Sequence, residues 1–98
     1  MIYHVEFAGA AARQYRKLDA FAKRQIDNYI AEYLEGTNNP RAYGKPLKGN
    51  LMGFWRYQIG DYRLITDIQD AVLTIWVMKV GHRREIYDGK KKLNRVQR

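Results

Sequence analysis

Residues 54–80, FWRYQIGDYRLITDIQDAVLTIWVMKV, decide the fold of this chain. The stretch is rich in β-branched and aromatic residues, which favour strands. It is interrupted at Gly60-Asp61 and at Gln69-Asp70, two dipeptides typical of tight turns. The pattern therefore predicts consecutive hairpins built from three strands, at residues 54–59, 62–68 and 71–80.

The residues before this meander predict one further strand and two helices. Ile2 to Phe7 has strand composition, and Ala10 to Leu18 is rich in helix formers. Asp19 is placed to cap a second helix, which Gly36 ends as a left-handed stop. That second helix carries an apolar stripe at helical spacing, made of Ile26, Tyr29, Ile30, Tyr33 and Leu34. Thr37 to Pro46, with its prolines and asparagines, predicts a loop.

Length and composition indicate one small domain over residues 1–98. With 46% hydrophobic residues the chain is too apolar for a disordered tail, and a mean hydropathy of −0.61 is too polar for a membrane protein. No run approaches the ~20 apolar residues of a spanning helix, and the N-terminus lacks the pattern of a signal peptide. The absence of cysteine excludes disulfides, thiolate zinc sites and a cysteine nucleophile. We expect a cytoplasmic protein without a metal or another cofactor.

The formal charge of +8 is concentrated at the C-terminal end. Residues 1–80 hold 11 Lys and Arg against 8 Asp and Glu, whereas the last 18 residues hold 7 against 2. The seven cations are Arg83, Arg84, Lys90, Lys91, Lys92, Arg95 and Arg98. Such a cluster suits a polyanion, most often nucleic acid, or an acidic protein partner. The alternative is a solvated tail whose charge aids solubility.

A two-residue turn at Gly60-Asp61 fixes which side chains share a face. Counting outward from the turn sets Gln58 opposite Arg63 and Arg56 opposite Ile65. Arg56, Gln58 and Arg63 then share an exposed, concave face with Asp67, Trp76 and Met78. The opposite, core face carries Trp55, Tyr57, Ile59, Tyr62, Leu64, Ile68, Leu73, Ile75 and Val77. The alternative is that Arg56 and Arg63 are ordinary solvent-side residues, with Asp67 as a counter-ion.

The segment from Val80 to Tyr87, VGHRREIY, contains an imidazole, two guanidiniums and a phenol within six residues. One guanidinium group can bind two phosphate oxygens at once, an imidazole can transfer protons near neutral pH, and an aromatic ring can stack on a base. These groups suit cleavage of RNA by its own 2′-hydroxyl, which needs a base, cations and an acid but no metal ion.

From the first strand through Tyr87 the chain resembles the RelE/ParE superfamily of toxins from prokaryotic toxin–antitoxin systems, and its RelE branch in particular. The segments that carry the resemblance are Lys17-Leu18-Asp19, Pro46-Leu47-Lys48-Gly49, Trp55-Arg56-Tyr57, Gly60-Asp61-Tyr62-Arg63-Leu64-Ile65 and the 80–87 segment. The resemblance implies an α+β fold, with two N-terminal helices packed on a mainly antiparallel four-stranded sheet and a short basic C-terminal segment. It implies a metal-independent mRNA endonuclease that works in the ribosomal A site and is neutralised by a RelB-like antitoxin.

The resemblance also implies the site residues. The cleavage site would consist of Arg56, Arg63, Arg83 and Tyr87, with Arg56 and Arg63 on the scissile phosphate. The best-known members have lysines where this chain has Arg56 and Gln58. Because arginine is a poor base, His82 becomes the candidate for proton exchange. RNA and the ribosome would contact the remaining basic and polar positions: Lys45, Lys48, Gln58, Arg84, Lys90, Lys91 and Lys92.

Two other functions stay open. One is a ParE-like inhibitor of DNA gyrase, which binds a protein and cleaves nothing. The other is a non-catalytic module that binds RNA or the ribosome through the same face.

Overall fold

The computed structural model describes residues 1–86. The helices are α1 (Gly9–Arg16) and α2 (Ala20–Tyr29), and α2 continues as one π-helical turn over Ile30–Leu34. The strands are β1 (His4–Phe7), β2 (Lys45–Pro46), β3 (Trp55–Ile59), β4 (Tyr62–Gln69) and β5 (Thr74–His82). Short 3-10 turns occupy Pro40–Ala42, Gly49–Leu51 and Asp70–Val72. No helix in this part of the chain has the length and apolar character needed to cross a bilayer.

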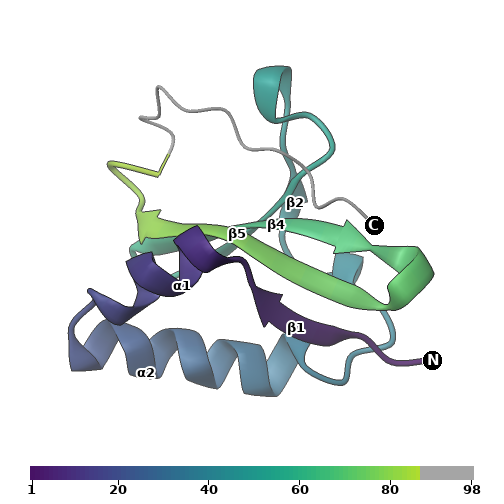
Figure 1. The fold of residues 1–98 in the computed structure, drawn as a ribbon, viewed down its shortest axis with the longest axis horizontal. Helices are drawn as coiled ribbons and strands as arrows, with labels where there is room; N and C mark the ends of the chain where they lie inside the picture. Colours follow the sequence, from purple (N-terminus) through teal and green to yellow (C-terminus); the bar gives the residue numbers. More distant parts are fainter. Residues whose placement is uncertain (87–98) are drawn as a thin grey trace.

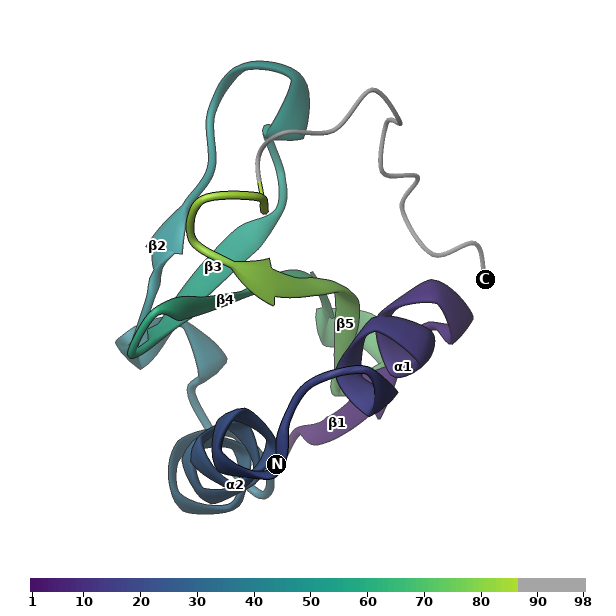
Figure 2. The same cartoon turned by 90° about the vertical axis from the view of Figure 1, so that its left-hand side faces the viewer.

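The strands form one mixed sheet in the order β1-β5-β4-β3-β2. Only the pair β1–β5 is parallel, and the other three pairs are antiparallel. Both helices lie on one side of this sheet (Figure 1). The 47–53 segment and the turn after β5 lie on the other side (Figure 2). The predicted α+β class is confirmed, and the sheet gains a fifth, two-residue strand from the end of the predicted loop.

The helix termini form where the sequence indicated. The side chain of Asp19 accepts a hydrogen bond from the backbone N–H of Ala22 at 2.8 Å, which satisfies one of the free donors at the start of α2. Gly36 has a φ of 82°, so the helical segment ends through the left-handed conformation that glycine tolerates best.

The first hairpin agrees with the prediction, and the second does not. Gly60 and Asp61 form a two-residue turn that pairs Ile59 with Tyr62. The second connection was predicted at Gln69-Asp70 but spans residues 70–73, where Leu73 is left-handed with a φ of 52°. Strand β5 consequently begins at Thr74 rather than at residue 71. Leu73 therefore belongs to the turn and not to the core face of a strand.

Two hydrophobic clusters lie on opposite faces of the sheet. The main core, beneath the helices, includes Tyr57, Leu64, Ile75 and Val77, each fully buried. A smaller cluster on the other face consists of Phe54, Ile65 and Ile86, with the partly buried side chains of Leu47, Leu51 and Met78 against it. The face predicted to be open and concave is therefore partly covered. Asp67, expected there as an exposed counter-ion, is fully buried and accepts a hydrogen bond from Gln69 at 2.8 Å.

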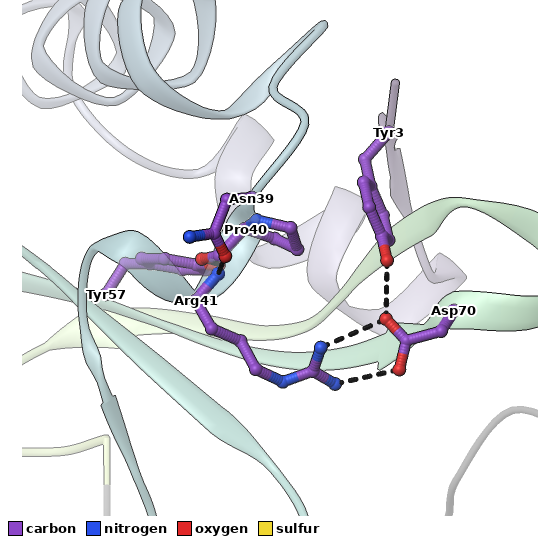
Figure 3. Close-up of polar contacts among 6 residues, drawn as sticks. All are labelled: Tyr3, Asn39, Pro40, Arg41, Tyr57 and Asp70. Atoms are coloured by element: carbon purple, nitrogen blue, oxygen red, sulfur yellow. Dashed lines mark hydrogen bonds and ion pairs between the residues drawn. The ribbon is translucent and has the colours of Figure 1, made fainter. Parts of the chain in front are cut away.

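A polar cluster fixes the segment between the helices and the hairpins (Figure 3). The guanidinium of Arg41 donates two hydrogen bonds to the Asp70 carboxylate, at 3.0 and 3.1 Å, and the Tyr3 hydroxyl donates a third at 2.6 Å. The buried Tyr57 hydroxyl donates to the carbonyl of Pro40 at 2.6 Å. These bonds connect the residue before β1, the 40–42 turn, β3 and the β4–β5 turn.

Candidate functional site

The register of the sheet collects cationic side chains on the face opposite the helices. Directly paired residues of an antiparallel ladder project on the same face. Gln58 pairs with Arg63, and Arg63 pairs with Gly81, while Lys45 pairs with Arg56. The predicted positions Arg56, Gln58 and Arg63 therefore share a face, and Lys45 joins them. We call this surface the cationic face; its residues are Lys45, Arg56, Gln58, Arg63 and Lys79.

Lys79 is a member of this face that the sequence did not indicate. Regular alternation from Met78 would place it on the core face. The ladder between β4 and β5 shifts its register between Ile65 and Thr66, and Lys79 pairs with Ile65 as a result. A β-bulge of this kind adds one residue to a strand and re-aims the side chains that follow it. Nothing in the sequence itself marks where such a bulge falls.

Two of the predicted arginines, Arg63 and Arg83, contact the β3–β4 turn. Arg63 Nη1 donates to the carbonyl oxygens of Gly60 and Tyr62, each at 2.9 Å. The backbone N–H of Arg83 donates to the carbonyl of Asp61 at 2.7 Å, and Arg83 Nε lies 3.5 Å from Asp61 Oδ1. The Arg83 and Asp61 side chains are 53% and 65% exposed, so this ion pair is open to exchange with an anionic ligand.

The chain folds back directly after β5. The carbonyl of His82 accepts the N–H groups of both Glu85 and Ile86 at 2.9 Å. Ile86 is buried in the smaller cluster, and a Cβ on Gly81 would lie only 3.2 Å from Ile86 Cδ1. The small residue at position 81 thus permits the close approach that fixes the 83–86 turn and presents Arg83 and Arg84 to solvent.

His82 lies on the other face of the sheet from Arg63. It pairs with Tyr62, whose side chain packs against the main core, and the two rings contact edge to face with centroids 5.6 Å apart. The backbone N–H of Arg84 donates to His82 Nδ1 at 3.1 Å. With Nδ1 acting as an acceptor, the neutral ring carries its proton on Nε2. The structure therefore does not bring His82 together with Arg56 and Arg63.

The remaining predicted positions are spread around this site. Lys48 is exposed at the start of the 3-10 turn Gly49–Leu51, and Arg84 is exposed in the turn after β5. Tyr87, Lys90, Lys91 and Lys92 lie outside the described residues. Within residues 1–86, no three His, Asp or Glu side chains gather in a group that could hold a metal ion.

Together, the fold and the cationic face define a small α+β protein with basic side chains on the sheet face opposite its two helices. The family described as "ParE toxin of type II toxin-antitoxin system" matches residues 5–87. The chain belongs to this family of toxins, and the resemblance to the RelE/ParE superfamily is confirmed.

Individual relatives cover nearly the whole chain. The toxin RelG of Mycobacterium tuberculosis is 34% identical over 89 residues, which span 89% of this chain and 98% of RelG. The mRNA interferase toxin RelE of Escherichia coli is 28% identical over 91 residues, which span 89% and 92% of the two chains. Among solved structures, a RelBE toxin–antitoxin complex of M. tuberculosis superposes with a TM-score of 0.75 at 30% identity, covering 85% of this chain and 100% of that one.

Proposed function

We propose that this chain is a toxin that cleaves mRNA on the ribosome and that a cognate RelB-like antitoxin neutralises it. The observation that carries the proposal is the sheet register, which sets Arg56 and Arg63 on one face and brings Arg63 and Arg83 to the same turn. The relative from E. coli is named an mRNA interferase toxin, which supports the class of activity, and the name toxin RelG supports the class of protein.

The proposed reaction is attack by the RNA 2′-oxygen on the adjacent phosphorus. The P–O2′ bond forms and the P–O5′ bond breaks, which leaves a 2′,3′-cyclic phosphate and a 5′-hydroxyl. Arg56 and Arg63 bind the non-bridging oxygens, since guanidinium groups match phosphate geometry and stay charged. Arg83 stabilises the negative charge on the departing 5′-oxygen. Tyr87, in the role that the family resemblance gives it, stacks on a neighbouring base.

The route of the proton differs from the sequence-based expectation. His82 faces Tyr62, and its Nδ1 already accepts a hydrogen bond. We therefore propose that His82 holds the 83–86 turn rather than exchanging a proton with RNA. Water takes the 2′-hydroxyl proton and supplies the proton to the 5′-oxygen, because arginine does not release its own near neutral pH.

The other cationic positions are proposed to bind the RNA backbone without reading its sequence. Lys45 lies beside Arg56 across the β2–β3 pair, and Lys48 and Arg84 are exposed near the same face. Gln58, next to Arg63, adds a hydrogen-bonding group, and Lys90, Lys91 and Lys92 extend the basic end. Because phosphate contacts release counterions, affinity for ribosomes should fall steeply as salt is raised.

The test uses purified chain and ribosomes programmed with a defined mRNA. We expect cleavage that depends on ribosomes, with 2′,3′-cyclic phosphate ends, and its loss in Arg63→Ala and Arg83→Ala. Arg24→Ala, which removes an exposed cation of α2, serves as the matched control and should cleave at the wild-type rate. Wild-type activity in both site variants would refute the proposed site, and intact mRNA with the wild-type protein would refute the proposed activity.

A second candidate is inhibition of DNA gyrase, because the family that matches residues 5–87 carries the ParE name. A gyrase inhibitor needs no constellation of Arg63, Arg83 and Tyr87 for chemistry. A supercoiling assay with the same preparation separates the two functions: inhibition of supercoiling without mRNA cleavage favours gyrase. Ribosome binding without either effect would indicate a non-catalytic module.

The proposed antitoxin is an acidic, amphipathic segment. It would complement the cationic face and cover the exposed guanidiniums, which both neutralises charge and blocks access of RNA. A short acidic reading frame beside this gene would encode the candidate antitoxin, and adding its product should stop mRNA cleavage in the ribosome assay. Undiminished cleavage in the presence of excess antitoxin would refute that partner.

A further inference from the structure

One side chain of α1 reaches the end of β5, where β1 no longer pairs with that strand. Strand β1 accompanies β5 only as far as the pair Phe7–Val77, and the N–H of Ala8 closes the ladder on the carbonyl of Val77 at 2.9 Å. Beyond this point the backbone of β5 has lost its neighbour on that side. The Oε1 atom of Gln14 accepts the N–H of Val80 at 2.8 Å.

This hydrogen bond sits at the base of the candidate catalytic turn. Val80 is buried, at 4% exposure, and it immediately precedes Gly81, His82 and Arg83. A buried backbone N–H needs a partner, and here a side chain 66 residues away in sequence supplies it. Gln14 thereby supplies the hydrogen-bond acceptor for Val80 that β1, which pairs with β5 only as far as Val77, does not supply.

The Gln14–Val80 bond lies at the wall of a cleft. Gln14 lines a cleft of about 530 Å³ together with Lys79, Val80, Gly81, Glu85 and Ile86. On its other side the turn is held by the Arg83–Asp61 hydrogen bond and by the buried Ile86. The end of β5 is thus fixed from the helical layer as well as from β4.

We propose that Gln14 is a positioning residue for RNA cleavage: its bond to Val80 fixes the end of β5 and, through it, the place of Arg83 relative to Arg63. The catalytic part of this inference rests on the proposed function. Gln14 touches neither RNA nor the reacting atoms. Small displacements of catalytic groups reduce the rate of the chemical step more than they reduce binding, so the effect should fall on kcat.

The test compares Gln14→Met, which keeps the length of the side chain and removes the acceptor, with Gln14→Glu, which keeps an acceptor oxygen. The same cleft is lined by one cation, Lys79, and one anion, Glu85, so the carboxylate of Gln14→Glu faces both charges. Asn28→Met, at an exposed position of α2, is the matched control. The measurements are hydrogen exchange at the Val80 amide, and kcat and KM for ribosome-dependent mRNA cleavage.

In Gln14→Met we expect the Val80 amide to exchange at least about tenfold faster while the Leu64 amide in β4 keeps its protection. We expect kcat to fall about tenfold with KM within about twofold, and Gln14→Glu to retain wild-type values in both measurements. Unchanged exchange at Val80, an unchanged kcat, or an equal loss in Gln14→Met and Gln14→Glu would overturn the inference. If the wild-type protein itself fails to cleave mRNA, the proposed function and the catalytic part of the inference fall together, and exchange at Val80 still decides whether Gln14 fixes β5.

Discussion

The backbone N–H of Arg84 donates to Nδ1 of His82 at 3.1 Å, so the imidazole of His82 helps to hold the turn that follows β5. We predict that His82→Asn keeps mRNA cleavage within about threefold of wild type, because asparagine places an acceptor oxygen where Nδ1 lies. His82→Ala lacks the acceptor and should lose about tenfold in rate as the turn loosens. The cleavage rates of the two variants distinguish a structural role of His82 from a role in proton transfer. A loss of activity in His82→Asn as large as that in His82→Ala would instead assign proton chemistry to the ring.

The proposed proton route gives a distinct pH profile. If the 2′-hydroxyl loses its proton to solvent before it attacks, log kcat should rise steadily between about pH 6 and 8, because the fraction of 2′-oxyanion increases with pH. A histidine base would instead produce a plateau above about pH 6.5, the ordinary midpoint of imidazole. Single-turnover cleavage on preformed ribosome complexes measures the profile. A plateau that disappears in His82→Asn would return the role of base to His82.

Substitutions of Arg83 and Asp61 should change the cleavage rate and the folding stability by different amounts. Arg83→Ala should lower the cleavage rate by about 100-fold or more, the usual cost of removing a donor that stabilises developing negative charge. Its folding stability should change by less than about 1 kcal/mol, since the ion pair is solvent-exposed. Asp61→Asn keeps the backbone carbonyl that holds Arg83 and should cleave within about threefold of wild type. Urea unfolding and cleavage assays on both variants check this, and an Asp61→Asn rate as low as that of Arg83→Ala would contradict it.

The Arg41–Asp70 pair should make stability depend on pH. Hydrogen bonds from Arg41, and then from Tyr3, hold the pKa of Asp70 below its ordinary value. A carboxyl with a lowered folded-state pKa stabilises the fold above its unfolded pKa of about 3.9, and this contribution is lost as pH falls through the folded value.

Asp70→Asn should therefore lower the free energy of unfolding by about 1 kcal/mol at pH 7, a modest amount because solvent screens these half-exposed side chains. The difference from wild type should shrink as the pH is lowered below about 3.9, because a protonated carboxyl is as neutral as the amide that replaces it. Urea titrations at several pH values measure it, with the exposed Glu32→Gln as control. A difference that is constant with pH would contradict the role of the charge.

The hydroxyl of Tyr57 should contribute measurably to the free energy of unfolding. Tyr57 is fully buried, burial raises the pKa of its phenol, and the O–H donates to the Pro40 carbonyl at 2.6 Å. Tyr57→Phe leaves that carbonyl without its partner and should cost about 1–2 kcal/mol of unfolding free energy. Tyr43→Phe, at an exposed ring, should cost close to nothing. Equal stabilities of the two variants in urea unfolding would contradict the prediction.

Local patterns in the sequence determined most of the fold. Asp19 and Gly36 mark helix ends because capping and left-handed backbone depend on a single residue type. Gly60-Asp61 sets a two-residue turn, and the two-residue period of strands then fixes that Arg56, Gln58 and Arg63 share a face. The second turn was misplaced because Leu73 adopts a left-handed conformation that its residue type does not favour.

Only the tertiary structure decided how the candidate site is assembled. The bulge that brings Lys79 beside Ile65, the pairing that sends His82 toward Tyr62, and the reach of Gln14 to Val80 all depend on where separate segments meet. The sequence alone indicated a small basic α+β toxin with Arg56 and Arg63 on the same face of the sheet. Which of its polar side chains lie at the candidate site, and which hold the backbone in place, depends on contacts between residues far apart in the chain, and no local pattern records them.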